Sequence, residues 1–483
     1  MEEAIELVFI PAPGMGHLVS AVEAAKLFLR TRPRLSITVF IMKLPFDSKV
    51  SSYTESLLAV ADDDESSRLK FIPLAVDPPE HLKDHPDKTL FFRSFVESHK
   101  PKVRDCVNEM KGSRIAGFVV DMFCDVMMDV ADELGLPTYV FYTSGAAMLG
   151  LHLHLQSLRD DHGVDVTEFK DSDPDLSVST YSKPFPVKLV PAVALLKTGG
   201  STMFLDIAKR LRQAKGTLVN TFFELEPHAL ESLSRDKNVP PVYPVGPILN
   251  IKSDSNGAAG EILTWLDDQP DSSVVFLCFG SGGSFPESQV KEIAHALERS
   301  GHRFLWSLRQ PPSGGSVYPA DYNNPEEVLP EGFLKRTKSI GKVIGWAPQA
   351  TVLAHRAVGG FLSHCGWNST LESVWFGVPM ATWPIYAEQQ ANAFQLVTDI
   401  GMGVDVKMDY KRDMMVGYTG VSEYVTAKEI ETGITSLMDH PATNPVWIKA
   451  NELKEISKNT LQEGGSSFNF LESFFEYVVK NLK

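Results

Sequence analysis

The chain has 483 residues, 43% of them hydrophobic and 22% charged, which is enough apolar material for two globular domains. Its formal net charge of −15 argues against a nucleic-acid partner, because phosphate backbones are bound by surfaces rich in Lys and Arg. The start lacks the basic region of a signal peptide, no apolar run approaches the roughly 20 residues that span a bilayer, and the four cysteines form no CxxC pair. We therefore expect a cytoplasmic protein without stable membrane insertion or a structural metal, and a monomer by default.

Apolar strand-like runs alternate with helix-like segments almost throughout the chain. The clearest runs lie at residues 7–10, 37–42, 118–120, 274–279, 304–308, 360–363 and 379–383. This alternation is typical of parallel α/β sheets. Each half also opens with a strand, a glycine loop and a helix, at residues 6–30 and 274–299. The sequence therefore predicts two α/β domains.

The boundary between the halves is marked by composition. Residues 240–247 are rich in proline, and residues 250–260 are polar and flexible in composition. We place an N-terminal domain at 1–248, a linker at 249–262 and a C-terminal domain at 263–463. The tail has apolar residues at helical spacing and no strongly basic face, so we expect a helix within 464–483 that docks onto the protein body.

The first candidate for chemistry is a pair of residues at expected strand ends. His17 follows the first strand and starts the next helix, at the sheet edge where open α/β sheets bind ligands. The positive end of the helix dipole disfavours a charged imidazole, so we expect His17 to be neutral and able to accept a proton. Asp121 ends the apolar run 115–120, where a carboxylate can hold an imidazole in one tautomer. The alternative that each residue only caps its own helix stays open.

A nicotinamide cofactor is discounted for the first glycine loop. Residues 14–19 form only a partial dinucleotide fingerprint, because Val19 stands where the third glycine is needed. The next strand ends in Lys43, without the acidic residue that binds a ribose.

The second candidate is a dense cluster of polar and aromatic residues at 346–389. The expected strand 360–363 runs into a helix that we expect to start at about Ser369. The first turn of such a helix offers free backbone N–H groups, which suits a diphosphate, and His364 and Asn368 add side-chain donors. A capping box of Ser369 and Glu372 is the plainer alternative, but it leaves the rest of the cluster unexplained.

This cluster resembles, without a gap, the signature box of the plant UDP-dependent glycosyltransferases that act on small molecules. It contains WAPQ at 346–349, the HCGWNS core at 364–369 and a terminal Glu-Gln pair at 388–389. The resemblance extends to PGMGH at 13–17 and to most of the chain. It implies the GT-B arrangement, in which two Rossmann-like domains with parallel sheets face a cleft. The N-terminal domain then binds the acceptor, the C-terminal domain binds the UDP-sugar, and the last helix returns to the N-terminal domain.

The resemblance also implies a role for each matching residue. Trp346 stacks on uracil while the Ala347 backbone reads its edge, and indole stacking on a base contributes ~1–3 kcal/mol. The ribose partners are Gln349 and Glu372, and the diphosphate ligands are Ser281, His364, Asn368 and Ser369. The sugar-binding group is Thr143, Trp367, Glu388 and Gln389. The Gln at the last position goes with glucose, and Trp367 stands where users of glucuronic acid tend to carry Arg.

These assignments lead to one hypothesis of function. The protein would transfer glucose from UDP-glucose, its co-substrate, to a hydroxyl of a small apolar secondary metabolite, with inversion to a β-glucoside. His17 is the expected base and Asp121 the expected stabiliser of its imidazolium, with no metal and no further cofactor. The acceptor is expected to be a flavonoid or another phenolic first and a terpenoid second. Its pocket is expected from residues 122–123, 144–155 and 181–204.

Two rival functions are kept. One is an NADP-dependent oxidoreductase built on residues 280–283 with Arg309 near the 2′-phosphate, although that glycine spacing does not complete GxGxxG. The other is a catalytically silent protein that binds a UDP-sugar, against which the presence of both His17 and Asp121 argues.

Overall fold

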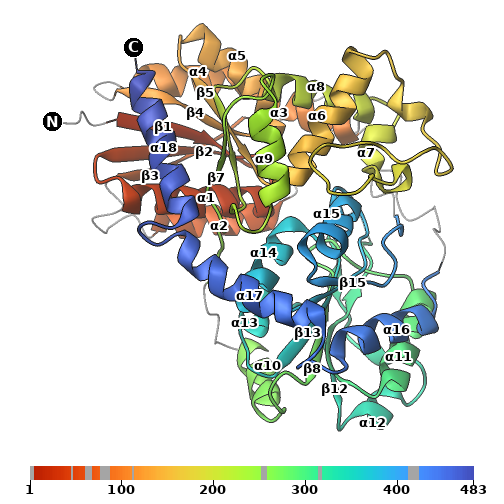
Figure 1. The fold of residues 1–483 in the computed structure, drawn as a ribbon. Coiled ribbons are helices and arrows are strands. Elements are labelled where there is room, and N and C mark those ends of the chain that lie inside the picture. The colour runs from red at the N-terminus through yellow and green to blue at the C-terminus, as the bar shows by residue number, and fades with distance from the viewer. Residues whose placement is uncertain are drawn as a thin grey trace.

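The computed structural model describes residues 5–44, 47–59, 68–76, 88–110, 114–251, 258–313, 318–411 and 424–482. These residues form two α/β units, each built around a parallel sheet, with the second unit drawn mainly in cyan and blue (Figure 1). The prediction of two α/β domains with parallel sheets is confirmed.

The N-terminal unit is built on a seven-stranded parallel sheet with the strand order β3-β2-β1-β4-β5-β6-β7. The strands are β1 (Ile5–Ile10), β2 (Leu35–Met42), β3 (Leu69–Leu74), β4 (Ile115–Asp121), β5 (Thr138–Tyr142), β6 (Gly216–Val219) and β7 (Val242–Pro244). The α-helices are α1 (Met15–Thr31), α2 (Ser48–Ala59), α3 (Lys88–Ser98), α4 (Lys100–Glu109), α5 (Met128–Glu133), α6 (Ala146–Asp160), α7 (Ala192–Leu195), α8 (Gly200–Leu211) and α9 (Pro227–Arg235). Short 3-10 helices lie at Met122–Met127, Val166–Glu168 and Val187–Leu189. Ligands of such doubly wound sheets bind beyond the carboxyl ends of the strands.

The C-terminal unit is built on a six-stranded parallel sheet with the strand order β12-β9-β8-β13-β14-β15. The strands are β8 (Val274–Cys278), β9 (Arg303–Ser307), β12 (Gly341–Ile344), β13 (Val358–Ser363), β14 (Met380–Thr382) and β15 (Gly403–Asp405), beside a small antiparallel pair of β10 (Arg309–Gln310) and β11 (Ala320–Asp321). The helices are α10 (Ala258–Asp267), α11 (Glu287–Ser300), α12 (Phe333–Thr337), α13 (Gln349–Leu353), α14 (Trp367–Phe376), α15 (Gln389–Gln395), α16 (Ala427–Met438) and α17 (Pro445–Thr460), with a 3-10 turn at Pro325–Glu327 and a π-helical turn at Leu396–Ile400. The last helix of the chain is α18 (Ser466–Lys480).

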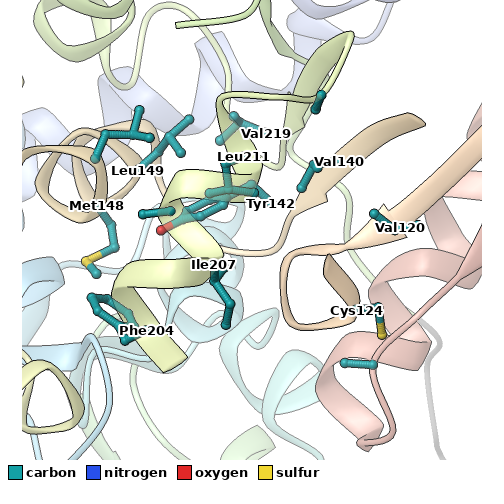
Figure 2. Close-up of a cluster of buried hydrophobic side chains, with 14 of the residues drawn as sticks. Val120, Cys124, Val140, Tyr142, Met148, Leu149, Phe204, Ile207, Leu211 and Val219 are labelled. Carbon is teal, nitrogen blue, oxygen red and sulfur yellow. The ribbon is translucent and has the colours of Figure 1, made fainter. Parts of the chain in front are cut away.

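Strand β1 shows how the N-terminal core is divided between the two faces of its sheet. Leu7 and Phe9 belong to one buried cluster, whereas Val8 and Ile10 belong to another. Successive side chains of a strand point to opposite faces, and a parallel sheet covered by helices is buried on both. Figure 2 shows part of the second cluster, where side chains from β4, β5, α6 and α8 meet. The continuous apolar runs of the sequence follow from this burial.

The tail helix α18 lies on the N-terminal unit, although it follows the C-terminal unit in the chain (Figure 1). Between ring centroids, Phe474 of α18 lies 5.0 Å from Tyr139 of β5, and Phe475 lies 5.5 Å from Phe28 of α1. Glu472 accepts a hydrogen bond of 2.9 Å from Arg32 at the end of α1. The chain therefore crosses between the units twice.

Buried polar contacts join the two units where the carboxyl ends of their sheets meet. Glu226 accepts hydrogen bonds of 2.9 Å from the backbone amides of Ala146 and Ala147, the first residues of α6. The same carboxylate accepts a bond of 2.7 Å from the side-chain amide of Gln395 in α15. Because α6 belongs to the first unit and α15 to the second, Glu226 connects a helix start in one to a side chain of the other.

Replacing Glu226 tests this junction. Glu226→Ala leaves three donors without their acceptor, so we expect the free energy of unfolding to fall by about 2–4 kcal/mol. Glu226→Gln keeps one acceptor oxygen and is expected to lose less. The measurement is thermal and urea unfolding, with Glu231→Ala as the control because the exposed Glu231 carboxylate forms an ion pair with Arg235 one helical turn away. Equal stability of Glu226→Ala and the control would contradict the expectation.

Candidate active site

The structure brings His17 and Asp121 together. The imidazole Nδ1 of His17 lies 2.8 Å from Oδ2 of Asp121 and 3.0 Å from the hydroxyl of Thr143. The three residues follow or end β1, β4 and β5, which are neighbours in the parallel sheet, so their side chains meet at one edge. The other oxygen of Asp121 accepts a bond of 2.9 Å from the backbone amide of Phe123. Asp121 therefore caps its local helix, as the plainer alternative proposed, and binds His17 as well.

This contact fixes the tautomer of His17. A nitrogen that faces a carboxylate must carry the proton of the hydrogen bond, so Nδ1 is the donor and Nε2 is left to meet a substrate. Burial alone lowers the pKa of His17, but the charge and hydrogen bond of Asp121 and the charge of Glu388 outweigh it and raise the pKa above 6.5. The carboxylates of Asp121 and Glu388 thus oppose the effect that was expected of the helix dipole on the pKa of His17.

Aromatic rings form one wall beside His17. The ring of Phe123 meets the imidazole edge to face at 5.4 Å between centroids, and Phe92 meets Phe123 in the same manner at 6.0 Å. Such a wall offers an apolar surface to a flat ligand. Residues 122–123 were expected near the acceptor, and Phe123 is indeed in contact with the candidate base.

A cavity of about 420 Å³ lies in the C-terminal unit. It is lined by every residue of the expected UDP set, namely Ser281, Trp346, Ala347, Gln349, His364, Asn368, Ser369 and Glu372. Trp346 keeps 53% of its surface exposed, which is unusual for so large an apolar side chain and leaves a ring face open to a ligand. The structure thus gathers on one cavity residues that are spread over almost a hundred positions of the chain.

Side chains on the cavity wall are already ordered by one another. The amide nitrogen of Gln349 donates to Ser369 at 2.9 Å and to Glu372 at 2.8 Å. Burial raises the pKa of Glu372 to about 7, although the bond from Gln349 acts in the opposite direction. The helix α14 begins at Trp367 rather than at Ser369, so its first turn, with its free N–H groups, lies on the cavity wall.

His364 is held neutral on the same wall. Burial lowers its pKa to about 4, so at neutral pH the imidazole carries no charge and donates through one N–H. Two glycines flank it closely, because a Cβ on Gly280 or Gly366 would come within 2.5 or 2.7 Å of Nε2. Gly280 has a φ of +71°, which further disfavours any other residue there.

The expected sugar-binding residues are more dispersed. Of the four, only Trp367 lines the cavity, and its indole is 2% exposed and donates to the carbonyl of Asn220 in the other unit at 2.7 Å. The side-chain carbonyl of Gln389 accepts from two backbone amides, at 2.9 and 3.0 Å, and the side chain also forms a hydrogen bond with the hydroxyl of Tyr386. Thr143 is bound to His17, and Glu388 is close enough for its charge to raise the pKa of that imidazole.

Several residues of the cavity wall were not expected there, among them three with polar side chains from outside the signature box. Ser307 ends β9, and Arg309 follows it and bonds to Asp321 at 2.8 Å. Both stand near a strand's carboxyl end, which is a signal that the sequence carries, although Arg309 was considered only for a nicotinamide cofactor. Asn250, in the segment between the units, is the third.

The described part of the chain holds neither a metal-binding cluster nor a membrane-spanning helix. No three His, Cys, Asp or Glu side chains there are grouped so that they could share a metal ion. None of the helices in those ranges has the length and apolar character needed to cross a bilayer.

Comparison with known proteins places the chain among close relatives. It is 52% identical to UDP-glucose flavonoid 3-O-glucosyltransferase 6 of Fragaria ananassa, with 99% of each chain covered, and 53% identical to UDP-glycosyltransferase 71E1 of Stevia rebaudiana, with 98% of each covered. Its fold matches the crystal structure of Medicago truncatula UGT71G1 complexed with UDP-glucose at a TM-score of 0.85 and 41% identity, over 98% of each chain. Residues 237–416 match the family model described as UDP-glucoronosyl and UDP-glucosyl transferase.

These matches confirm the resemblance seen in the sequence and the GT-B arrangement that it implied. The chain belongs to the plant UDP-dependent glycosyltransferase family, and it is a UDP-glycosyltransferase that acts on small secondary metabolites.

Proposed function

We propose that this enzyme is an inverting O-glucosyltransferase that joins glucose from UDP-glucose to a hydroxyl of a flavonoid or another phenolic, with terpenoids as the second choice of acceptor. The hydrogen bond of 2.8 Å between His17 and Asp121 carries the proposal, because it supplies a base whose protonated form is stabilised. The Fragaria relative is named a flavonoid 3-O-glucosyltransferase, and the Medicago structure holds UDP-glucose, which supports both substrates.

The proposed reaction is a single displacement. The acceptor hydroxyl gives its proton to Nε2 of His17, and its oxygen forms a bond to the anomeric carbon of glucose. The bond from that carbon to the diphosphate breaks on the opposite face, and the electron pair leaves with UDP. Asp121 stabilises the imidazolium through Nδ1, and general-base catalysis of this kind contributes about 10²–10⁴-fold. The product is a β-glucoside.

The leaving diphosphate gains negative charge in this step. The first turn of α14 and the neutral imidazole of His364 offer N–H donors on the cavity wall where the diphosphate is proposed to lie. Donors held in place before the reaction stabilise developing charge without a cost of reorganisation. A charged histidine is not required for this role.

The choice of glucose rests on Gln389 and Trp367. The Gln389 carboxamide is oriented by its two backbone bonds, so its NH₂ group points in one direction, as selection among sugar epimers requires. The Trp367 side chain carries no positive charge, and its indole N–H donates to the carbonyl of Asn220. It therefore offers no partner to a glucuronate carboxylate.

The acceptor side is supported by the aromatic wall of Phe123 and Phe92 beside His17. The expectation for residues 144–155 needs revision, because most side chains of α6, among them Met148 and Leu149, are buried in the core cluster of Figure 2. A flat phenolic ring would pack on the aromatic wall and place its hydroxyl near Nε2 of His17.

The base is tested by His17→Ala. We expect turnover with UDP-glucose and a phenol to fall by about 10²–10⁴-fold, because the proton of the hydroxyl then has no acceptor. UDP affinity should stay within about threefold of the parent value, since His17 is not on the cavity wall. Product formation is followed by chromatography and UDP binding by calorimetry. His228→Ala, at an exposed histidine of α9, is the control. Near-normal turnover of His17→Ala on a phenol of ordinary acidity would show that another group is the base.

The pH dependence of turnover tests the role of Asp121. The base works only when His17 is neutral, so activity falls as the pH drops through the pKa of His17, which lies above 6.5. Asp121→Asn removes the charge and the hydrogen bond to the charged form that raise this pKa, so the acid limb of the kcat/KM profile should move to lower pH while the maximum rate falls. An acid limb that stays in place would mean that it does not report on His17.

Donor stacking is tested by Trp346→Ala. Loss of ~1–3 kcal/mol of stacking should weaken UDP binding by roughly 5- to 150-fold, while the KM for the acceptor changes little. Trp346→Phe should recover part of the affinity. Tyr424→Ala is the matched control, since Tyr424 is similarly exposed at 48% and does not line the cavity. If Trp346→Ala leaves the UDP affinity unchanged, Trp346 does not stack on the uracil.

A further inference from the structure

We propose that Asn250, in the segment between the two units, is a further UDP-binding residue whose side-chain oxygen accepts a hydrogen bond from a ribose hydroxyl. This inference rests on the proposed function, because it takes the cavity of about 420 Å³ to be the UDP site. It adds a contact from a residue that lies outside the signature box at 346–389.

Asn250 is fixed in place by the residues that precede it. The backbone amide of Ile248 donates to the side-chain oxygen of Asn220 at 2.7 Å, and the side-chain nitrogen of Asn220 donates back to the Ile248 carbonyl at 3.1 Å. Leu249 packs against the buried cluster that contains Leu371 of α14. The chain is therefore held by Asn220, which follows β6, and by the buried cluster of the C-terminal unit just before Asn250 reaches the cavity wall.

The side-chain oxygen of Asn250 is buried, and within the described ranges no donor is within hydrogen-bond distance of it. A buried acceptor without a partner is costly, and such groups in native proteins are normally satisfied by protein, water or ligand. Since the same residue lines the UDP cavity, a donor on the nucleotide is the partner that the location favours. This oxygen is thus an acceptor prepared before the ligand arrives.

The chemistry of UDP narrows the choice of donor. The diphosphate at neutral pH offers only acceptors, so it cannot satisfy this oxygen. The uracil N3–H is taken, in the proposed function, by the Ala347 backbone. The ribose hydroxyls remain, and they are proposed to lie beside Gln349 and Glu372, which share the cavity wall with Asn250. A ribose hydroxyl can donate to Asn250 while it accepts from another group.

The test compares UDP with 2′-deoxy-UDP and 3′-deoxy-UDP by calorimetry on the full chain. Asn250→Leu, which keeps the shape and removes the acceptor, should weaken UDP binding about 5- to 30-fold. One of the two deoxy analogues should bind the parent and the variant equally, because the hydroxyl that Asn250 contacts is missing from it. Asn250→Asp keeps an acceptor oxygen and should keep the discrimination against that analogue.

A second readout separates binding from folding. Asn250→Leu removes a buried unpaired oxygen, so the Tm of the free protein should not fall, whereas a structural role would lower it. Asn238→Leu, at an exposed asparagine, is the control for the substitution itself. The proposal is overturned if Asn250→Leu binds UDP like the parent, or if all three ligands weaken by the same factor. Failure of the parent protein to bind UDP would instead remove the proposed function.

Discussion

The geometry of the proposed catalytic residues depends on three parallel strands that lie side by side. β1, β4 and β5 are neighbours in the sheet, so the residues at their carboxyl ends, His17, Asp121 and Thr143, converge although they are up to 126 positions apart in the chain. The strands are buried on both faces and do not move independently, which fixes the distance of 2.8 Å that joins the imidazole to its carboxylate. A base on a flexible loop would lack this constraint.

Two histidines of the site show how the surroundings of an imidazole determine its pKa. Burial lowers the pKa of both, but only His17 has carboxylates close enough to reverse the direction, in Asp121 and Glu388. His364 lies between two glycines without such a partner, and its pKa falls to about 4. One imidazole is therefore suited to take up a proton, and the other to donate a hydrogen bond while remaining neutral.

Much of this site could be predicted from the sequence because its residues lie at the ends of strands. An apolar run shows where a buried strand ends, and the signature box could be matched from Trp346 to Gln389, so all the predicted UDP-binding residues line the cavity, together with others that were not predicted. Effects that arise from tertiary contacts were not foreseen. The raised pKa of His17 comes mainly from Asp121, and a smaller part comes from Glu388, which is remote in sequence and belongs to the other unit.

The domain junction could not be predicted for a similar reason. Glu226 and Gln395 carry no motif that relates them, and their bond exists only once the two units are docked. The indole of Trp367 lines the cavity, and docking also gives its N–H a partner in the carbonyl of Asn220, which the sequence did not indicate. Side chains of α6 that looked suitable for an acceptor are in the core, because an apolar helix does not reveal which of its faces borders a cavity.

Transfer between two domains requires that the docking be accurate as well as stable. The proposed base belongs to one unit and the proposed donor cavity to the other, and the proposed displacement would tolerate little error in the approach of oxygen to carbon. Apolar contacts alone are non-directional and permit sliding. Glu226 and Trp367 each make a buried hydrogen bond across the junction, with fixed length and direction. Because Glu226 also holds the start of α6, which follows directly on the turn that carries Thr143, the bond that aligns the domains also fixes the segment beside the base.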